Sequence, residues 1–141
     1  KSKKTVILTP KSGDYGVDVL SFSGQQIQLI QCKHTTWGAP CDTDVVIETI
    51  NAFDNYKLRW LRNATGFVLR PGIVTNGTFT KSARILAQDR DVSCMGLKDL
   101  MDMIRKSPCT LAGIELMENK RKSSMNEVGH ELKGWISKKI G

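Results

Sequence analysis

The chain has 141 residues, enough for one compact domain with a buried core but short for two. Hydrophobic residues make up 40% and charged residues 25%, a balance that excludes disordered, collagen-like and coiled-coil proteins, and no apolar run approaches the roughly 20 residues that cross a bilayer. The 21 Lys and Arg exceed the 14 Asp and Glu and give a net charge of +7, which favours a polyanionic partner, either nucleic acid or an anionic membrane surface.

The first third of the chain predicts three strands. A β-branched run over Thr5–Thr9 predicts the first, and a glycine-punctuated loop follows over residues 11–16. Two further strand-like runs cover Val17–Ser23 and Gln26–His34. Gly24 leads the two-residue loop between them, which is typical of a β-hairpin. We therefore expect these two strands to pair antiparallel.

A long helix is predicted after a turn-rich stretch. It extends from about Thr43 to Leu61, with either Asp42 or Thr43 as its N-cap. The apolar positions have helical spacing. The expected buried stripe consists of Val46, Ile50, Phe53, Tyr56 or Lys57, and Trp60.

Strands and helices alternate in the second half of the chain. A strand is expected over residues 66–74, where the Pro71-Gly72 pair indicates either an interruption or a pairing edge. Thr80 is the expected N-cap of a helix that continues through Gln88. A short strand over Val92–Met95 and a helix over Leu97–Arg105 follow.

An amphipathic helix is predicted over Met125–Ile140, after a polar, basic connector. Its expected apolar stripe consists of Val128, Leu132, Trp135 or Ile136, and Ile140. The complete pattern predicts an α/β fold with a mixed central β-sheet and flanking helices. We expect one domain over residues 1–141, with its core at about 5–105 and a basic C-terminal helical segment at about 125–140.

The four cysteines are dispersed and form no C-x-x-C pair. Neither a disulfide framework nor a zinc site is therefore indicated. This usage favours a reducing, intracellular compartment.

The hairpin turn fixes the pairing of its strands. If Ser23 pairs with Gln26, paired residue numbers sum to 49 and Asp18 lies opposite Gln31. Because side chains alternate, one face is predicted to hold Asp18, Leu20, Phe22, Ile27, Leu29, Gln31 and Lys33, and the other Val17, Val19, Ile30 and a core-facing Cys32. Polar groups at the end of an apolar face are costly unless they are paired or bind an ion. Either a salt bridge between Asp18 and Lys33 or an ion site would satisfy them.

Three sequence segments resemble one nuclease family. They are GDYGVDV at residues 13–19, IQCK at residues 30–33 and GIVTNGTFTKSARILA at residues 72–87. Together they resemble the Mrr-like branch (type IV restriction endonuclease-like) of the PD-(D/E)XK nuclease superfamily, over roughly residues 13–104. The resemblance implies a restriction-endonuclease-like core and a metal-dependent endonuclease that hydrolyses phosphodiester bonds in DNA.

The resemblance also implies roles for three residues. Asp18 matches the metal-binding aspartate, Gln31 the position more often occupied by Glu, and Lys33 the lysine. The expected cofactor is Mg²⁺, with Mn²⁺ able to substitute, held by the Asp18 carboxylate, the Gln31 side-chain carbonyl and the backbone carbonyl of Cys32. Lys33 is expected to orient or help deprotonate the attacking water and to stabilise charge on the phosphate.

Gln31 is neutral, so the expected site has one acid fewer than is usual and a further acid should be sought. Asp14 is one candidate, with the alternative that it forms an Asx turn or is a solvated loop acid. Glu127 and Glu131 are the others if the C-terminal helix takes the place of the helix that usually precedes the first strand in this family. Their alternative is that both are surface glutamates.

Residues outside this cluster are candidates for contact with DNA. Lys81 and Arg84 would contact phosphates, and His34 would lie near the DNA at the surface. Trp37 either stacks on a base, wedges into a groove or packs under its own loop.

We also expect DNA as the partner and no association with a membrane. The chain could form a homodimer, and a longer parent protein could carry an additional specificity domain. The main alternative function is a catalytically inactive nucleic-acid-binding domain that keeps the nuclease fold. A second alternative is a protein-interaction module whose basic surface provides solubility.

Overall fold

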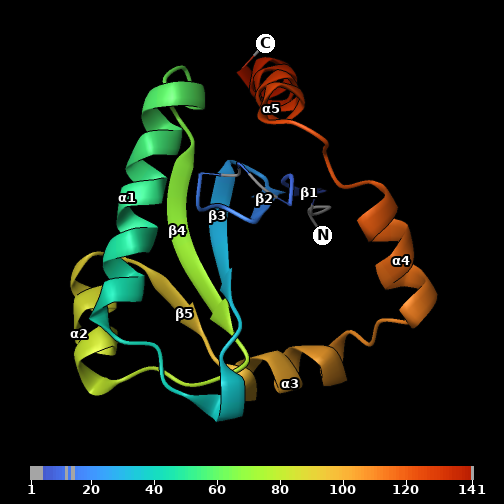
Figure 1. Cartoon of the computed structure of the whole chain (residues 1–141). Coiled ribbons are helices and arrows are strands. Elements are labelled where there is room, and N and C mark those ends of the chain that lie inside the picture. Colours follow the sequence, from blue (N-terminus) through green and yellow to red (C-terminus); the bar gives the residue numbers. More distant parts are fainter. Residues whose placement is uncertain (1–4, 12, 14, 141) are drawn as a thin grey trace.

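The computed structural model of the chain describes residues 5–11, 13 and 15–140. Its strands are β1 (Thr5–Leu8), β2 (Val19–Ser23), β3 (Gln26–Lys33), β4 (Val68–Thr75) and β5 (Ser93–Met95). Its helices are α1 (Thr43–Trp60), α2 (Lys81–Asp89), α3 (Leu97–Lys106), α4 (Leu111–Asn119) and α5 (Met125–Ile140), with a short 3₁₀ turn at Thr36–Gly38. Figure 1 shows their arrangement.

The strands of this part of the chain form one mixed sheet in the order β1-β2-β3-β4-β5. The β1–β2 and β2–β3 pairs are antiparallel, whereas the β3–β4 and β4–β5 pairs are parallel. Parallel neighbours need a crossover connection, and α1 and α2 provide the two crossovers here. The predicted α/β fold with a mixed central sheet and flanking helices is confirmed.

The hairpin has the predicted register over the length of β2. Ser23 pairs with Gln26, Leu20 with Leu29, and Val19 with Ile30. Gly24 has a φ of +59° at the turn, a conformation that glycine adopts without a steric penalty.

The alternation of side chains changes at the first residue before β2. Val19 is the pairing partner of Ile30, yet the N–H of Asp18 also donates to the carbonyl of Ile30 at 2.9 Å. Two consecutive residues thus lie opposite one, which is a β-bulge. As a result Val17 is buried in the same cluster as Leu20, and the prediction that Val17 lies on the opposite face is wrong. The predicted pairing of Asp18 opposite Gln31 is wrong for the same reason, because Asp18 lies opposite Ile30.

Helix α1 begins where the sequence predicts, and the side chain of Asp42 accepts a hydrogen bond from the N–H of Thr43. Its buried residues are Val46, Thr49, Ala52 and Tyr56, while Ile50 and Phe53 are only partly buried. The buried side of α1 thus contains the smaller Thr49 and Ala52 in place of the predicted Ile50 and Phe53. A Cβ added at Gly16 would lie 3.0 Å from the Ala52 Cβ, so the loop before β2 approaches α1 at a place where only small side chains fit.

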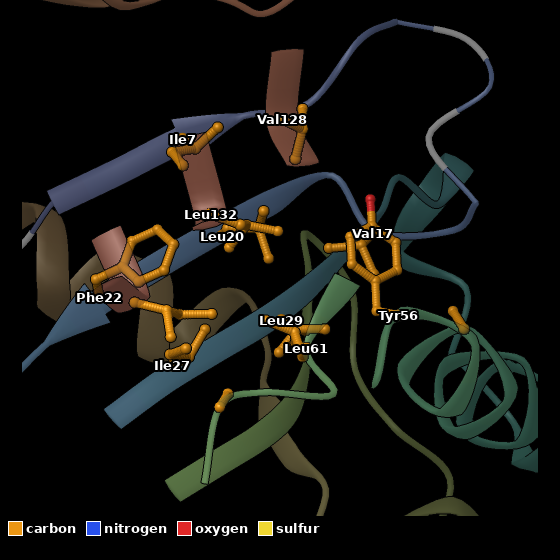
Figure 2. Close-up of a cluster of buried hydrophobic side chains, with 13 residues drawn as sticks. Ile7, Val17, Leu20, Phe22, Ile27, Leu29, Tyr56, Leu61, Val128 and Leu132 are labelled. Carbon is orange, nitrogen blue, oxygen red and sulfur yellow. The ribbon is translucent and has the colours of Figure 1, made fainter. Parts of the chain in front are cut away.

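Two buried clusters join the helices to the sheet. In the first, Leu20, Phe22, Ile27 and Leu29 pack with Tyr56 of α1 and with Val128 and Leu132 of α5 (Figure 2). The second joins α1, α2 and β4 and contains Cys41, Val46, Ile73, Phe79, Ala83, Ala87 and Val92. Both clusters include residues of α1, which therefore lies against the face of the sheet that also carries Gln31.

The structure decides one alternative that the sequence leaves open and adds one helix. Pro71 does not interrupt its strand, because β4 is continuous, whereas the alternative of a pairing edge is confirmed, because pairing with β5 begins at Gly72. Strand β5 pairs only with Gly72–Val74, so Pro71 loses no ladder hydrogen bond on that side. Helix α4 was not predicted.

Helices α3 and α4 lead away from the sheet before the chain returns at α5 (Figure 1). Neither helix has a buried residue. Within the described residues, no helix is both long enough and apolar enough to cross a membrane.

Candidate active site

The ends of β3 and β4 and the first turns of α1 meet at one place. Gln31 and Lys33 are near the end of β3, paired with Ile73 and Thr75 of β4. The loop that follows β3 is held to the end of β4 by Asn76, whose side chain bonds both the N–H and the carbonyl of Thr35, at 2.7 and 3.0 Å. Carboxyl ends of parallel strands are common sites for ligands.

Gln31 and Lys33 share one acidic partner, Glu48 of α1. The Gln31 Nε2 donates to Glu48 Oε1 at 3.1 Å. The Lys33 Nζ lies 3.0 Å from Glu48 Oε2 and 3.3 Å from Oε1. Gln31 is 5% exposed, whereas the side chains of Lys33 and Glu48 are 31% and 53% exposed. The polar cluster therefore extends from the sheet interior to an accessible surface.

The amide of Gln31 has a second partner on α1. The Thr49 Oγ1 lies 2.6 Å from Gln31 Oε1 and 2.8 Å from the carbonyl oxygen of Val45. Thr49 is 3% exposed. Gln31 is thus held at both ends of its amide by consecutive residues of one helix.

Asp18 is joined to the residue between Gln31 and Lys33. Its Oδ2 accepts a hydrogen bond of 2.7 Å from the N–H of Cys32. The buried Thr9 fixes the backbone beside it, with its Oγ1 at 2.7 Å from the carbonyl oxygen of Val17 and at 3.0 Å from that of Asp18. The bulge before β2 therefore holds Asp18 against the end of β3.

Cys32 lies on the exposed side of β3, so the expectation that its side chain belongs to the core is wrong. Desolvation raises the pKa of the Cys32 thiol, and the negative charge of Asp18 raises it further. Arg121, whose Nη1 donates to the carbonyl of Thr9 at 2.8 Å, acts in the opposite direction.

The chemistry of the donor set fits a divalent cation of the Mg²⁺ type. Asp18 and Glu48 offer carboxylate oxygens and Gln31 an amide oxygen, which are the hard ligands that Mg²⁺ prefers. In the described part of the chain, no three His, Cys, Asp or Glu side chains come together as a metal-binding group. Amide and backbone oxygens would have to complete the ligand set.

The sequence analysis missed Glu48. The sequence did contain a signal that the start of this helix faces the strand. The helix follows the IQCK strand directly, and Thr49 is three residues after the inward-facing Val46, so helical spacing places Thr49 on the same side. Of the acids proposed from sequence, Asp14 lies outside the described residues. Glu127 accepts hydrogen bonds from Ser123, and Glu131 pairs with Lys122.

The candidate nucleic-acid contacts are all exposed. Trp37 has an exposed fraction of 101% and a φ of +58°, so the alternative that it packs under its own loop is wrong. His34 and Lys81 are exposed, and the exposed Arg84 lies over the ring of Phe79. A non-glycine residue with positive φ is a strained conformation that is concentrated at functional sites.

Comparisons with known proteins identify the family of the chain and its fold. The chain matches the family Mrr_cat, described as a restriction endonuclease, over residues 2–104. No curated protein matches it.

Solved structures similar to the chain include three proteins. A protein of unknown function, AF1548, has a TM-score of 0.53 at 18% identity, over 86% of this chain and 80% of that one. The MspJI restriction endonuclease in complex with a 27-mer oligonucleotide has a TM-score of 0.52 at 17% identity, over 99% of this chain and 27% of that one. A repair endonuclease from Pyrococcus abyssi has a TM-score of 0.45 at 19% identity, over 62% of this chain and 34% of that one. The likeness to AF1548 and MspJI shows a shared fold.

Proposed function

The chain belongs to the Mrr_cat restriction endonuclease family, and on this premise we propose that it is a metal-dependent endonuclease that hydrolyses phosphodiester bonds in DNA. One observation carries the proposal: Asp18, Gln31 and Lys33 lie at one end of a hairpin, and Glu48 adds an acid there. Carboxylates that can hold a divalent cation, beside an ammonium group, are suited to hydrolysis of a phosphodiester.

Each residue has a distinct role in this proposal. Asp18 and Glu48 would hold the cation, and the carbonyl oxygens of Gln31 and of the Cys32 backbone would complete its protein ligands. A bound Mg²⁺, or Mn²⁺ in its place, neutralises phosphate oxygens and acidifies a water molecule. Lys33 orients that water and stabilises the charge that develops on the phosphate.

The formal charges support this assignment. Two carboxylates, Asp18 and Glu48, and one ammonium, Lys33, give the cluster a net charge of −1. A divalent cation changes this charge to +1, which matches the single negative charge of one phosphodiester group. The cluster alone repels DNA, whereas the loaded site attracts it.

The surrounding surface supports a DNA partner. The net charge is +7, and Lys81 and Arg84 offer exposed positive charge on α2. Trp37 provides an exposed ring for stacking on a base, and His34 is also exposed. A homodimer would supply two sites for two strands, and a further domain of a longer protein would select the sequence.

The four cysteines, which all lie in the described part of the chain, are free thiols. Free thiols persist in reducing surroundings, which supports placement of the protein inside the cell.

Cleavage of supercoiled plasmid with Mg²⁺ or Mn²⁺ tests the proposal. We expect nicked and linear products with the wild type, no product with EDTA, and strongly reduced product with Asp18→Asn. Gln31→Glu adds a carboxylate and should lower the Mn²⁺ concentration needed. Asp54→Asn is the matched control, because Asp54 is an exposed acid on the same helix as Glu48.

A catalytically inactive DNA-binding domain is the second candidate. The ion pair between Lys33 and Glu48 and the neutral Gln31 favour it, because both lower the attraction of the cluster for a cation. Retained DNA binding without cleavage across Mg²⁺ and Mn²⁺ would decide for this candidate and against a nuclease.

A further inference from the structure

The hydroxyl of Thr49 has two acceptors and one proton. Its Oγ1 lies 2.6 Å from Gln31 Oε1 and 2.8 Å from the carbonyl oxygen of Val45. A hydroxyl donates one hydrogen bond at a time and accepts others through its lone pairs. Two hydrogen-bond arrangements are therefore compatible with the same positions of the heavy atoms.

In the first arrangement the hydroxyl donates to Gln31 Oε1. The Gln31 Nε2 then donates to Glu48 Oε1 at 3.1 Å. All partners are satisfied, but the amide oxygen is covered by Thr49 and the NH₂ group faces the acid. An NH₂ group has no lone pair to offer a cation, so in this arrangement Gln31 is not a metal ligand.

In the second arrangement the hydroxyl donates to the carbonyl of Val45, the usual acceptor four residues earlier in a helix. The Gln31 amide is turned by half a rotation, so that Nε2 donates to Thr49 Oγ1 and the amide oxygen faces Glu48. Two oxygen acceptors would then lie about 3 Å apart, because the oxygen takes the place of Nε2. They repel unless a cation lies between them.

We propose that Thr49 is a positioning residue that couples the orientation of the Gln31 amide to occupancy of the site. Without a divalent cation, Thr49 donates to the amide oxygen and the NH₂ group donates to Glu48. With the cation bound, Thr49 accepts from the NH₂ group and the amide oxygen becomes a ligand. The inference rests on the proposed function, because it concerns the cation that a nuclease site would hold.

The packing around Gln31 permits the half-turn of its amide group without movement of other side chains. The two ends of a carboxamide are nearly equal in shape, and the last torsion of Gln is broad and roughly two-fold. Gln31 and Thr49 are 5% and 3% exposed, so water is a poor substitute for the hydroxyl. Thr49 thus explains how a neutral residue takes a position that is usually acidic.

Nuclear magnetic resonance of the full chain tests the inference directly. The readout is the NOE between the Gln31 side-chain NH₂ protons and the γ-methyl of Thr49, followed during titration with diamagnetic Mg²⁺ in the absence of DNA. We expect the NOE to strengthen as Mg²⁺ binds.

The Thr49→Val variant keeps the γ-methyl reporter and the shape of the side chain but removes the hydroxyl. It should therefore abolish the Mg²⁺-dependent change in the NOE. It should also weaken Mg²⁺ binding about tenfold, as loss of one hydrogen bond implies. Thr49→Ser should restore both.

The possible results separate this inference from the proposed function. An unchanged NOE, with Mg²⁺-dependent shifts at Asp18 and Glu48, would overturn the role of Thr49 and leave the nuclease assignment standing. Equal Mg²⁺ affinity of Thr49→Val and wild type would also overturn it. If Mg²⁺ shifts no resonance of Asp18, Gln31 or Glu48, both proposals fail.

Discussion

The carboxylate of Glu48 has two competing partners at the residue scale. It accepts from Gln31 Nε2 and pairs with the Lys33 ammonium. An ion pair with this much exposure contributes about 0–1 kcal/mol to stability. Its removal should therefore change the chemistry of the site far more than the fold.

Lys33→Ala tests this separation. We expect cleavage to fall about 10²–10⁴-fold, the range for loss of a proton-transferring or charge-stabilising group. Thermal unfolding and DNA binding should stay close to those of the wild type. Lys57→Ala, which removes another exposed lysine, on α1, should cut normally. Near-normal cleavage by Lys33→Ala would remove Lys33 from its role.

The sequence predicted part of the site for a specific reason. Alternation along one strand places Gln31 and Lys33 on the same face. The arithmetic from Gly24 fails at Asp18, because the bulge puts Asp18 opposite Ile30 and its carboxylate on the N–H of Cys32. Glu48 and Thr49 reach Gln31 from a helix 17 and 18 residues along the chain. Helical spacing from Val46 indicates that Thr49 faces inward, but the contact with Gln31 depends on how α1 packs on the sheet. The face of Val17 was wrong because a bulge is not visible in an alternating pattern.

The loop before β2 is the critical feature at the element scale. Gly16 has a φ of +84°, and an added Cβ would lie 3.0 Å from the Ala52 Cβ. Gly13 also has a positive φ, +69°, but an added Cβ there would meet nothing within 4 Å. Comparing alanine variants at these two glycines therefore separates the free-energy cost of the backbone conformation from the free-energy cost of the steric contact with α1.

Gly16→Ala should destabilise the protein more than Gly13→Ala in urea unfolding. Gly13→Ala should cost about 1–2 kcal/mol, the left-handed penalty for an L-residue, and Gly16→Ala should add a steric penalty. Gly16→Ala should also lower cleavage, because the loop leads directly into the bulge that holds Asp18. Equal costs for the two variants would show that the approach to Ala52 is not tight.

The starts of α1 and α2 are joined by Asp42. The N–H of Thr43 and the hydroxyl of Thr80 both donate to its Oδ1, at 2.8 Å each. These two hydrogen bonds, the first being the larger effect, lower the pKa of Asp42 below its ordinary value. The charged form is thus favoured in the folded state.

This shift predicts a pH dependence of stability. Because the folded pKa is lowered, the stabilisation is fully present above the ordinary Asp pKa of about 3.9 and is lost as the pH falls through that value toward the folded pKa. Melting temperatures measured down to about pH 3 should fall less steeply for Asp42→Asn than for the wild type. Identical pH profiles would exclude this contribution.

The fold at the whole-molecule scale was largely predictable. The sheet pattern, the α1 and α2 caps at Asp42 and Thr80, and the α5 stripe at Val128, Leu132 and Ile136 all follow from local signals. Helix α4 was missed because its apolar residues, such as Leu111 and Met117, do not form one clear face and none is buried. The continuity of β4 through Pro71 depends on the shortness of β5, which is a tertiary property.

The net charge of +7 predicts salt-dependent DNA binding. In a filter-binding titration, Lys81→Ala and Arg84→Ala should each reduce the log–log salt slope by about 1. Trp37→Ala should weaken affinity by about 1–3 kcal/mol per stacked base without changing that slope. Salt-independent binding would contradict an interface built on phosphate contacts.

The most direct measurement of the central claim is anomalous diffraction from crystals soaked with Mn²⁺. The account predicts one peak bounded by the carboxylates of Asp18 and Glu48 and by the Gln31 amide oxygen, with Lys33 beside it, and no such peak in Asp18→Asn crystals. A Mn²⁺ ion bound elsewhere on the chain, with these side chains unchanged, would contradict it.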